Sequence, residues 1–474
     1  MRQNWKSIVK TPEKAFVIIS VIFGILFLLI TPPFQAADEY QHFYRSFQVS
    51  QGGFISEKKI VDCHGRLVYT PAAICVGGML PKSVLITAKQ ASTVDLRFQP
   101  ENKQKVQDII SLLNLPLKRQ DKIFVRFPNA ALYSPIPYLP QALGMAIGQL
   151  FGVSSIIIFY LGRAVNLLVW VGLIYLAIKV TPIYKWLVFL LALTPMQLFQ
   201  AASLSADAFT NGASFLLAAI FFQIAFEPAP TIKPIKILSI ALLSILIGLS
   251  KTAYFPLNLL YFLIPIKKLG SFVKYFIGFA GINLLTLIAI LAWSSLIKDL
   301  YIPLRPATDN VVLSEQINYI LNHPTQFILT QLNTFSTYGL NYLEQLIGKL
   351  GWLDTSLPSF HIISYIILLV TVALVSHRSD VKISLFQKAI TLIIILLTGL
   401  LITTAMYLAW TPVGAGLIEG VQGRYFIPLT PLFFLLFYNQ KININLKIPS
   451  STLTGYALFS CTLTAAILLK RYYM

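Results

Sequence analysis

Residues 15–30, AFVIISVIFGILFLLI, run directly into TPPFQAADE at residues 31–39. The first stretch is uncharged and comes close to the ~20 apolar residues that a helix needs to cross a bilayer. Basic residues precede it, as in a signal peptide, but no small-residue cleavage site follows; these are Arg2, Lys6, Lys10 and Lys14. The sequence therefore predicts an uncleaved signal-anchor that leads into an acidic pair, Asp38 and Glu39.

The rest of the chain repeats this apolar pattern. Of the 474 residues, 56% are hydrophobic and only 12% are charged, whereas soluble domains carry about 25% charged residues. The apolar runs extend to residue 470, which excludes a soluble protein with one greasy domain. We expect an all-α polytopic membrane protein with about eleven spans, which begin near Ala15, Ser154, Ile183, Asp207, Ile235, Thr252, Ser271, His361, Leu385, Arg424 and Ser451.

Basic residues mark alternate connections between these runs. Lysine and arginine hold short loops on the cytoplasmic side, and one set of connections contains Lys179, Lys185, Lys233, Lys236, Lys267, Lys268, Lys274, Arg378, Lys382, Lys388, Lys441 and Lys447. This pattern predicts a cytoplasmic N-terminus in a bacterial cytoplasmic membrane. It also accounts for the net charge of +19 without nucleic-acid binding.

The orientation divides the chain into five segments. Residues 1–31 are a cytoplasmic stub and the first span, and 32–153 form a large extracytoplasmic loop. Residues 154–297 hold spans 2–7, 298–359 a second extracytoplasmic segment with amphipathic helices, and 360–474 the last spans. Within the first loop, the proline-containing stretch at 131–152 is expected to be re-entrant or interfacial. Cys63 and Cys75 either form a disulfide there or remain free thiols.

Charged residues collect at the outer ends of these spans. Beside Asp38 and Glu39, the predicted topology places Arg163, Asp207, Lys251, Glu419 and Arg424 at one outer level. Ionisable residues at membrane depth are costly and usually functional, so we expect one polar cavity there. Because no ATP or nucleotide sugar exists outside the cytoplasm, an enzyme at this place needs a substrate that arrives activated in the membrane, such as a polyprenyl-phosphate sugar.

Several ordered blocks carry a family resemblance. They are TPPFQAADEYQHFYRSFQVSQGG, LYSPIPYLPQALG, LGRAVNLLVWVGLIYLAIK, LALTPMQLFQAASLSADAFTN, GLSKTAYFPL, LGWLDTSLP and VQGRYFIPLTPLF. From residue 31 to about 435 the chain resembles the bacterial membrane family named domain of unknown function 2142, which is similar to the GT-C glycosyltransferases. The resemblance implies a polyprenyl-linked donor and a catalytic acid in the first outer loop, where Asp38 and Glu39 stand.

Each candidate residue has a functional and an ordinary interpretation. Asp38 is the expected general base and Glu39 its alternate or partner, but both could be a solvated helix end. Asp207 could line the site or cap a helix, and Asp354 could act in the site or in a turn. Lys251 and Arg424 are expected at the phosphate, or else at lipid headgroups. The remaining expected contacts are Arg163, which could merely bridge helices, His42 and Arg45, which could form a local ion pair with Asp38 or Glu39, Tyr138 and Gln422.

These residues predict a glycosyltransferase that moves a sugar from a polyprenyl phosphate to an extracytoplasmic glycan, with inversion and with Asp38 as base. A divalent metal is possible, but no metal-binding motif is present. A polymerase or ligase that uses pyrophosphate-linked oligosaccharides has the same sidedness and stays open. A flippase is less favoured because carboxylates are nearly absent from the inner halves of the spans, and a scaffold without chemistry is the last alternative.

Overall fold

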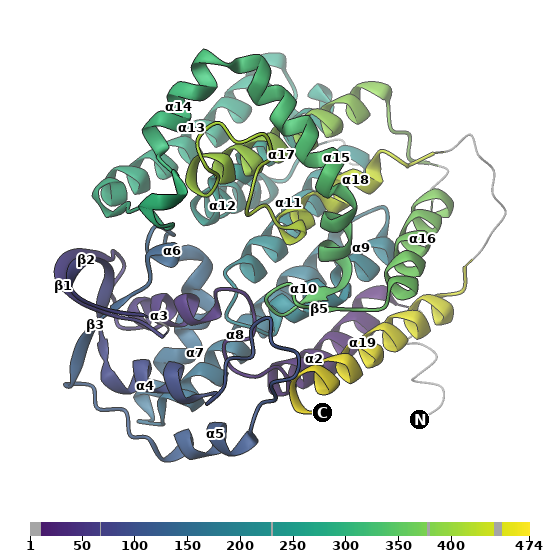
Figure 1. Ribbon diagram of the computed structural model, residues 1–474. Coiled ribbons are helices and arrows are strands. Elements are labelled where there is room, and N and C mark those ends of the chain that lie inside the picture. Colours follow the sequence, from purple (N-terminus) through teal and green to yellow (C-terminus); the bar gives the residue numbers. More distant parts are fainter. Residues whose placement is uncertain (1–10, 67, 229–230, 377–379, 440–447) are drawn as a thin grey trace.

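The computed structural model describes residues 11–66, 68–228, 231–376, 380–439 and 448–474 (Figure 1). Several basic residues behind the predicted orientation lie outside these ranges, namely Arg2, Lys6, Lys10, Arg378, Lys441 and Lys447. Lys268, from the same set, donates to the carbonyl oxygens of Ile224 and Glu227, at the C-terminal end of α11 (Asp207–Phe226). A cation at a helix C-terminus complements the helix dipole.

Six helices are long and apolar enough to cross a membrane within the described residues. They are α2 (Pro12–Ile30), α8 (Ser155–Val180), α11, α13 with its 3-10 extension η5 (Phe272–Leu300), α17 (Leu385–Ala409) and α19 (Ser450–Tyr473). The chain is therefore a multi-spanning, mostly helical membrane protein.

The other five expected spans take shorter or interrupted forms. α12 (Pro234–Ser250) and α16 (Ser359–Val375) have 17 residues each. Proline interrupts the remaining three, because it removes a backbone donor and clashes with the preceding turn. These are α9 and α10 (Lys185–Ala192 and Pro195–Ala201), the 3-10 helix η3 (Thr252–Leu263, followed by η4, Ile266–Leu269), and η7 with α18 (Gly423–Leu429 and Thr430–Leu435). The count of about eleven spans stays a prediction.

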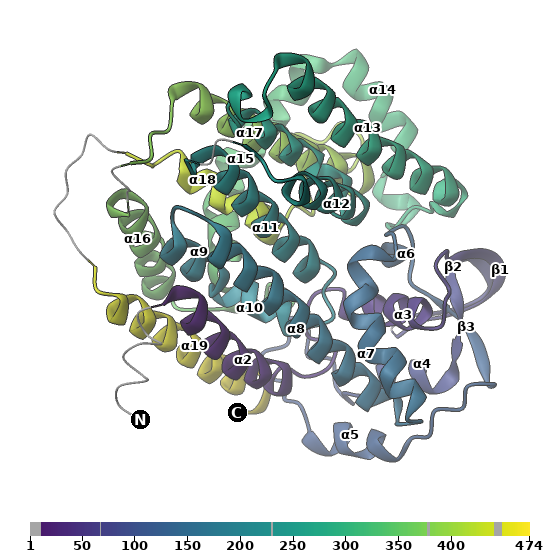
Figure 2. The ribbon, with the colours of Figure 1, turned by 180° about the vertical axis from the view of Figure 1, so that it is seen from behind.

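The spanning helices differ in how much of their surface the protein covers. In α11, 83% of the most apolar window is buried, against 17% in α13. α11 is apolar all round and is therefore a core helix of the bundle. The leucine and isoleucine side chains of α13 are exposed on the outside of the bundle, which suits contact with lipid. α2 packs between α8 and α19, and the three lie side by side from both directions (Figures 1 and 2).

The first outer loop is a mixed α/β unit, so the expectation of an all-α chain is wrong here. Its strands are β1 (Glu57–His64), β2 (Tyr69–Pro81) and β3 (Lys122–Arg126), and β2 pairs antiparallel with both others. The strands lie at the left of Figure 1, at one side of the helical bundle. Its helices are α3 (Glu39–Ser50), α4 (Lys82–Gln90), α5 (Val106–Ser111), η1 (Leu112–Asn114), α6 (Pro128–Ala131), η2 (Ile136–Tyr138) and α7 (Leu139–Leu150).

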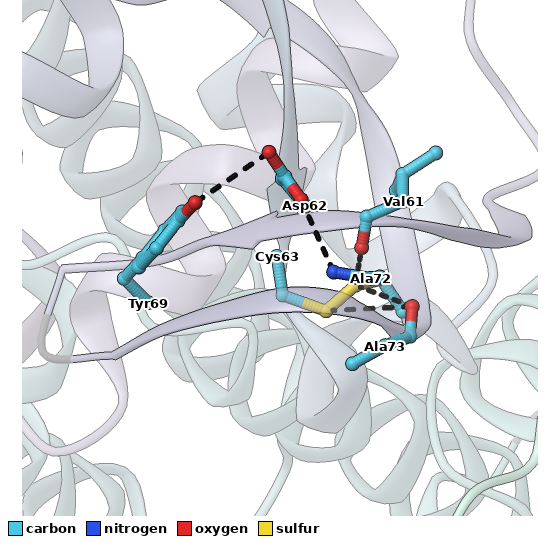
Figure 3. Close-up of a disulfide and its surroundings, with 7 residues drawn as sticks. Val61, Asp62, Cys63, Tyr69, Ala72 and Ala73 are labelled. Carbon is cyan, nitrogen blue, oxygen red and sulfur yellow. Dashed lines mark hydrogen bonds between the residues drawn. A yellow bond between two sulfur atoms is a disulfide. The ribbon is translucent and has the colours of Figure 1, made fainter.

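A disulfide and close backbone contacts fix this unit. Cys63 and Cys75 are joined across β1 and β2 (Figure 3), which chooses between the two alternatives left by the sequence. At Gly144 of α7, an added Cβ would lie 2.3 Å from the carbonyl oxygen of Leu161 in α8. The prolines and glycines of the 131–152 stretch therefore make a short helix that packs directly on a span.

The second outer segment contains two helices, α14 (Leu313–Asn322) and α15 (Pro324–Gly348), preceded by η5 (Lys298–Leu300) and η6 (Ala307–Asp309). A small two-stranded sheet follows, formed by β4 (Lys349–Leu350) and β5 (Thr355–Ser356). Ile328, Leu332 and Leu340 on α15 are exposed, as an amphipathic helix at a membrane surface requires.

Candidate functional site

Asp38 stands at the position before α3 with a carboxylate that the helix does not use. Its φ of 59° lies in the left-handed region, which costs a non-glycine residue energy but which aspartate tolerates better than most. An aspartate here would normally accept a hydrogen bond from the first helical turn, yet the Asp38 side chain makes no such bond. The backbone strain thus leaves the carboxylate, 32% exposed, free to face the site.

Asp38 belongs to a cluster of two carboxylates and two cations. A guanidinium nitrogen of Arg424 lies 3.9 Å from the Asp38 carboxylate, and its Nε lies 3.9 Å from Asp207. Lys251 Nζ is 3.7 Å from the other Asp207 oxygen. Four residues that are up to 386 positions apart in the sequence therefore meet in one cluster, as expected from the prediction that they share one level of the bundle.

The two cations of this cluster have unused hydrogen-bonding capacity. Arg424 Nε is buried without a hydrogen-bond partner in the part of the chain that the structure describes. Lys251 Nζ sits 3.9 Å from the centroid of the Tyr425 ring and beyond ordinary hydrogen-bond distance from Asp207. Lys251 also ends α12, where a positive charge complements the helix dipole. Both groups can therefore accept an additional anion without breaking a short ion pair.

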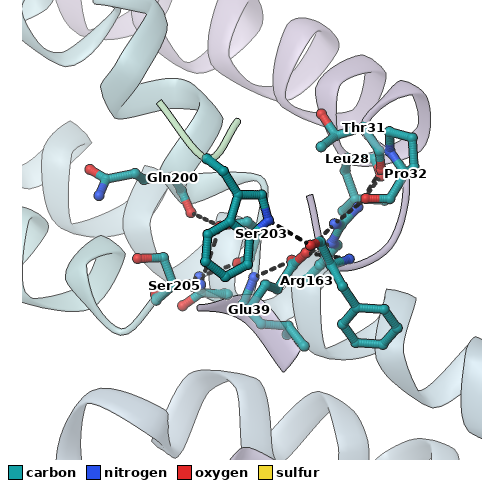
Figure 4. A network of polar contacts seen from close by, with 12 residues as sticks. Leu28, Thr31, Pro32, Glu39, Arg163, Gln200, Ser203 and Ser205 are labelled. Atoms are coloured by element: carbon teal, nitrogen blue, oxygen red, sulfur yellow. Dashed lines mark hydrogen bonds and ion pairs between the residues drawn. The ribbon is translucent and has the colours of Figure 1, made fainter. Parts of the chain in front are cut away.

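Glu39 and Arg163 occupy a different place from Asp38. Both side chains are fully buried and form a two-pronged ion pair, with nitrogen–oxygen distances of 2.8 and 2.6 Å (Figure 4). Glu39 also accepts from the backbone amides of Phe34 and Leu204. Arg163 donates further to backbone carbonyls of Leu28, Thr31 and Pro32.

This pair ties the outer end of α2 to α8 and to the start of α3. Each Glu39 oxygen accepts two hydrogen bonds, so the carboxylate is saturated. Arg163 also stacks over the Phe159 ring at 4.5 Å. Neither side chain lines either of the two cavities described below, so the expected roles of Glu39 as alternate base and of Arg163 at a phosphate stay predictions. The geometry fits a structural clamp.

The other expected contacts divide in the same way. His42 hydrogen-bonds through Nδ1 to the Tyr138 hydroxyl at 2.9 Å, and Tyr133 packs beside both rings. Arg45 is fully buried and, among the described residues, forms no ion pair with Asp38 or Glu39. It donates instead to Gln48 and to the carbonyls of Gly53, Phe54 and Tyr133.

Asp354 and Gln422 line neither of the two cavities described below. Asp354 pairs with Arg471 at 3.2 Å and accepts from the amides of Phe98 and Trp352, which makes it a joint between the two outer segments and the C-terminal helix. The Gln422 side-chain oxygen is buried without a hydrogen-bond partner among the described residues.

Two cavities flank the cluster and share no lining residue. The first, about 220 Å³, has Lys251, Tyr133 and Ser134 at its polar end and walls from α12 and α13. We call it the membrane-side cavity. The second, about 290 Å³, is lined by Asp38, Arg66, Arg126, Trp352, Trp410 and other outer-segment residues, and we call it the outer cavity. The sequence did not single out Arg66 or Arg126, because nothing local distinguishes them from other surface arginines.

His42 makes stability depend on pH. Burial lowers its pKa, and this outweighs the opposing effect of the nearby Asp38 and Asp207 carboxylates. Below about pH 6.5, His42 is protonated in the unfolded chain but still neutral in the folded protein. As the pH falls further, this group therefore lowers the free energy of unfolding by up to about 1.4 kcal/mol per pH unit. In thermal unfolding between pH 7.5 and 5.5, His42→Asn should lose less stability than wild type, while the exposed control His323→Asn should match wild type. Equal slopes for all three proteins would contradict this.

The described residues contain no group of three or more histidine, cysteine, aspartate or glutamate side chains that could hold a metal ion. The cluster itself offers two carboxylates, of which Asp38 is the more exposed, beside two cations. No curated protein matches this sequence, and no solved structure matches it. The family described as "Predicted membrane protein (DUF2142)" matches residues 21–433. Because this match covers most of the 474 residues, the chain belongs to that family.

Proposed function

We propose that this protein is a membrane glycosyltransferase that moves a sugar from a polyprenyl-phosphate donor to an extracytoplasmic glycan, with inversion at the anomeric carbon. The observation that carries the proposal is the position of Asp38. Its carboxylate lies 3.9 Å from Arg424 and lines the outer cavity, whereas Lys251, on the other side of the cluster, lines the membrane-side cavity. A direct displacement needs a base at the acceptor, cations at the leaving phosphate, and separate access for the two substrates.

The membrane-side cavity suits the donor. Its walls come from α12 and from α13, the span with the most exposed apolar surface. A polyprenyl chain can lie along that surface while the phosphate reaches Lys251 and Arg424. The phosphate brings negative charge to two cations whose donors are incompletely used, which makes charge-assisted hydrogen bonds possible.

The reaction then follows from the atoms in place. Asp38 takes the proton of the acceptor hydroxyl, and that oxygen forms a bond to the anomeric carbon. The bond between the anomeric carbon and the phosphate oxygen breaks with its electron pair, so polyprenyl phosphate leaves with a charge that Lys251 and Arg424 neutralise. Attack from the side opposite to the leaving group inverts the anomeric configuration. Asp207 holds the two cations in register, since it faces both.

The function is tested with the full chain in proteoliposomes. A panel of undecaprenyl-monophosphate hexoses with a labelled sugar is offered together with glycan extracted from the host envelope, and transfer is followed by the label in the glycan. The proposal expects transfer from at least one monophosphate donor, with inverted configuration by NMR. Transfer only from undecaprenyl-pyrophosphate oligosaccharides would replace it with the polymerase or ligase alternative. Movement of intact donor across the bilayer without transfer would identify a flippase.

The cations give a second prediction. Lys251→Met and Arg424→Met should each weaken binding of a short polyprenyl monophosphate about tenfold to a hundredfold, because each removes a charged contact to phosphate. Binding is measured by scintillation proximity on the purified chain in detergent. Arg305→Met is the matched control, since Arg305 lies at the outer surface in an ion-pair network with Asp309 and Glu419. Equal affinity of Lys251→Met and wild type would remove Lys251 from the phosphate site.

A further inference from the structure

The outer cavity contains two arginines that have no anionic partner. In the described ranges, neither Arg66 nor Arg126 forms an ion pair, and Arg66 Nη1 is buried without a hydrogen bond. Nearby Arg97, by contrast, is paired with Asp95 at 3.1 Å. A buried cationic nitrogen without a partner is costly to a folded protein, and half-buried Arg126 adds a second unpaired cation to the same cavity. The two cations outnumber the one carboxylate that lines the cavity, Asp38, which indicates a place for a further anion.

The strand pairing of the outer unit holds these two arginines close together. Arg66 follows β1 within three residues of Cys63, so the disulfide anchors the strand that carries it. Arg126 ends β3, and the stem of its side chain passes under Gly65, where an added Cβ would lie 3.2 Å from Arg126 Cγ. Strand pairing of His64 with Val125 joins the two strands at this point. Backbone pairing between β1 and β3 therefore fixes the positions from which the two arginine side chains extend.

Aromatic side chains also line the outer cavity. Trp352 stacks on Tyr40, with ring centroids 6.2 Å apart and an interplanar angle of 26°, and Trp410 also lines the cavity. Gln41 and Asn129 add polar groups to the same lining. Flat aromatic surfaces with a few placed polar groups are typical of binding sites for organic ligands, and here the charged side selects a ligand that carries an anion.

We infer that the outer cavity binds the acceptor and that this acceptor is an anionic glycan, with phosphate or carboxylate groups that contact Arg66 and Arg126. The role of this ligand as acceptor rests on the proposed function. The binding of an anionic sugar polymer rests only on the residues that line the cavity. The lining separates this anion from the donor phosphate. The outer cavity is built from the outer segments, whereas α12 and α13 wall the membrane-side cavity, and α6 contributes Pro128 and Asn129 to the outer lining just before Leu132 and Tyr133 enter the other.

The geometry also orients the acceptor. Asp38 lines the same cavity as Arg66 and Arg126, so a glycan held by its anionic group on the arginines and by its sugar faces on the tryptophans places a hydroxyl near the base. The two arginines are positioning and specificity residues, because they hold the acceptor and not the reacting atoms.

The test measures binding without turnover. Fluorescent hexagalacturonate, its methyl-esterified neutral form, and a poly(glycerol phosphate) oligomer are titrated against the full chain in nanodiscs. We expect the carboxylate or the phosphate oligomer to bind at least tenfold more tightly than the neutral form. Arg66→Gln and Arg126→Gln should each weaken that binding about tenfold, and the double variant about a hundredfold. Arg66→Lys with Arg126→Lys should restore part of it, and the exposed Arg119→Gln should leave it unchanged.

A separate arm distinguishes the two proposals. Binding of a short polyprenyl monophosphate should be the same in the double glutamine variant and in wild type, because that phosphate belongs to Lys251 and Arg424. If the double variant loses lipid-phosphate binding instead, the arginines hold the donor and the inference is overturned. Equal binding of neutral and anionic oligomers would also overturn it. A third outcome is that the protein binds anionic oligomers but transfers sugar from no lipid donor. That outcome would contradict the glycosyltransferase proposal and would still support the anion site.

Discussion

Asp38→Asn is expected to lower sugar transfer by about 10²–10⁴-fold while the protein stays folded. Removal of a positioned base has an effect of this size. Asparagine has the same shape and also tolerates the left-handed backbone that Asp38 adopts at φ 59°. Because the Asp38 side chain does not cap α3, the change removes no helix-stabilising hydrogen bond.

The measurement is initial rate in proteoliposomes at saturating lipid donor, with thermal unfolding recorded on the same preparations. Asp121→Asn, an exposed aspartate in the same outer unit, is the matched control and should keep both rate and stability. An Asp38→Asn protein with more than a tenth of the wild-type rate would show that another group takes the proton.

Glu39→Gln should have the opposite profile, a large loss of stability. Glu39 and Arg163 are both fully buried and paired at 2.6 Å, and removal of one partner from a buried pair leaves an uncompensated charge that costs about 3–5 kcal/mol. In a chain of 474 residues, a loss of that order lowers the unfolding temperature by about 3–5 °C. The variant should therefore be recovered in lower yield and unfold earlier in detergent.

Two further variants separate this clamp from catalysis. Removal of both charges in Glu39→Gln with Arg163→Met should recover part of the stability, since no unpaired charge remains in the interior. Glu344→Gln, an exposed glutamate on α15, should unfold as wild type does. If Glu39→Gln is as stable as wild type but inactive, Glu39 acts in the reaction and the assignment of the base to Asp38 alone falls.

The sequence predicted which end of the spans carries the charged cluster, but it did not separate the roles of the individual residues. Topology alone placed Asp38, Asp207, Lys251 and Arg424 at the outer ends of the spans, and the structure brings them within 4 Å of a neighbour in the cluster. Residues 38 and 39 are adjacent, yet Asp38 faces a cavity and Glu39 faces Arg163. That division depends on one left-handed residue and on a partner 124 positions away, which no local pattern reveals.

The outer unit was the least predictable part of the fold. β1 reads EKKIVDCH and mixes charged and apolar residues without regular alternation, so a strand is not apparent until β2 and β3 are beside it. The pairing of Arg471 with Asp354 and the convergence of Arg66 and Arg126 on the outer cavity also arise from contacts between distant segments. In the spans, the sequence did not predict that the stretch 252–263 would become a 3-10 helix.

The most direct test of the account is a cryo-EM map of the full chain in nanodiscs with a polyprenyl-phosphonate sugar, in which carbon replaces the scissile oxygen. The account predicts phosphorus density whose oxygens lie about 3 Å from Lys251 Nζ and the Arg424 guanidinium, with the anomeric carbon on the Asp38 side and the lipid tail along α12 and α13. Density for the phosphonate at the inner ends of the spans, or against Arg66 and Arg126 in the outer cavity, would contradict it.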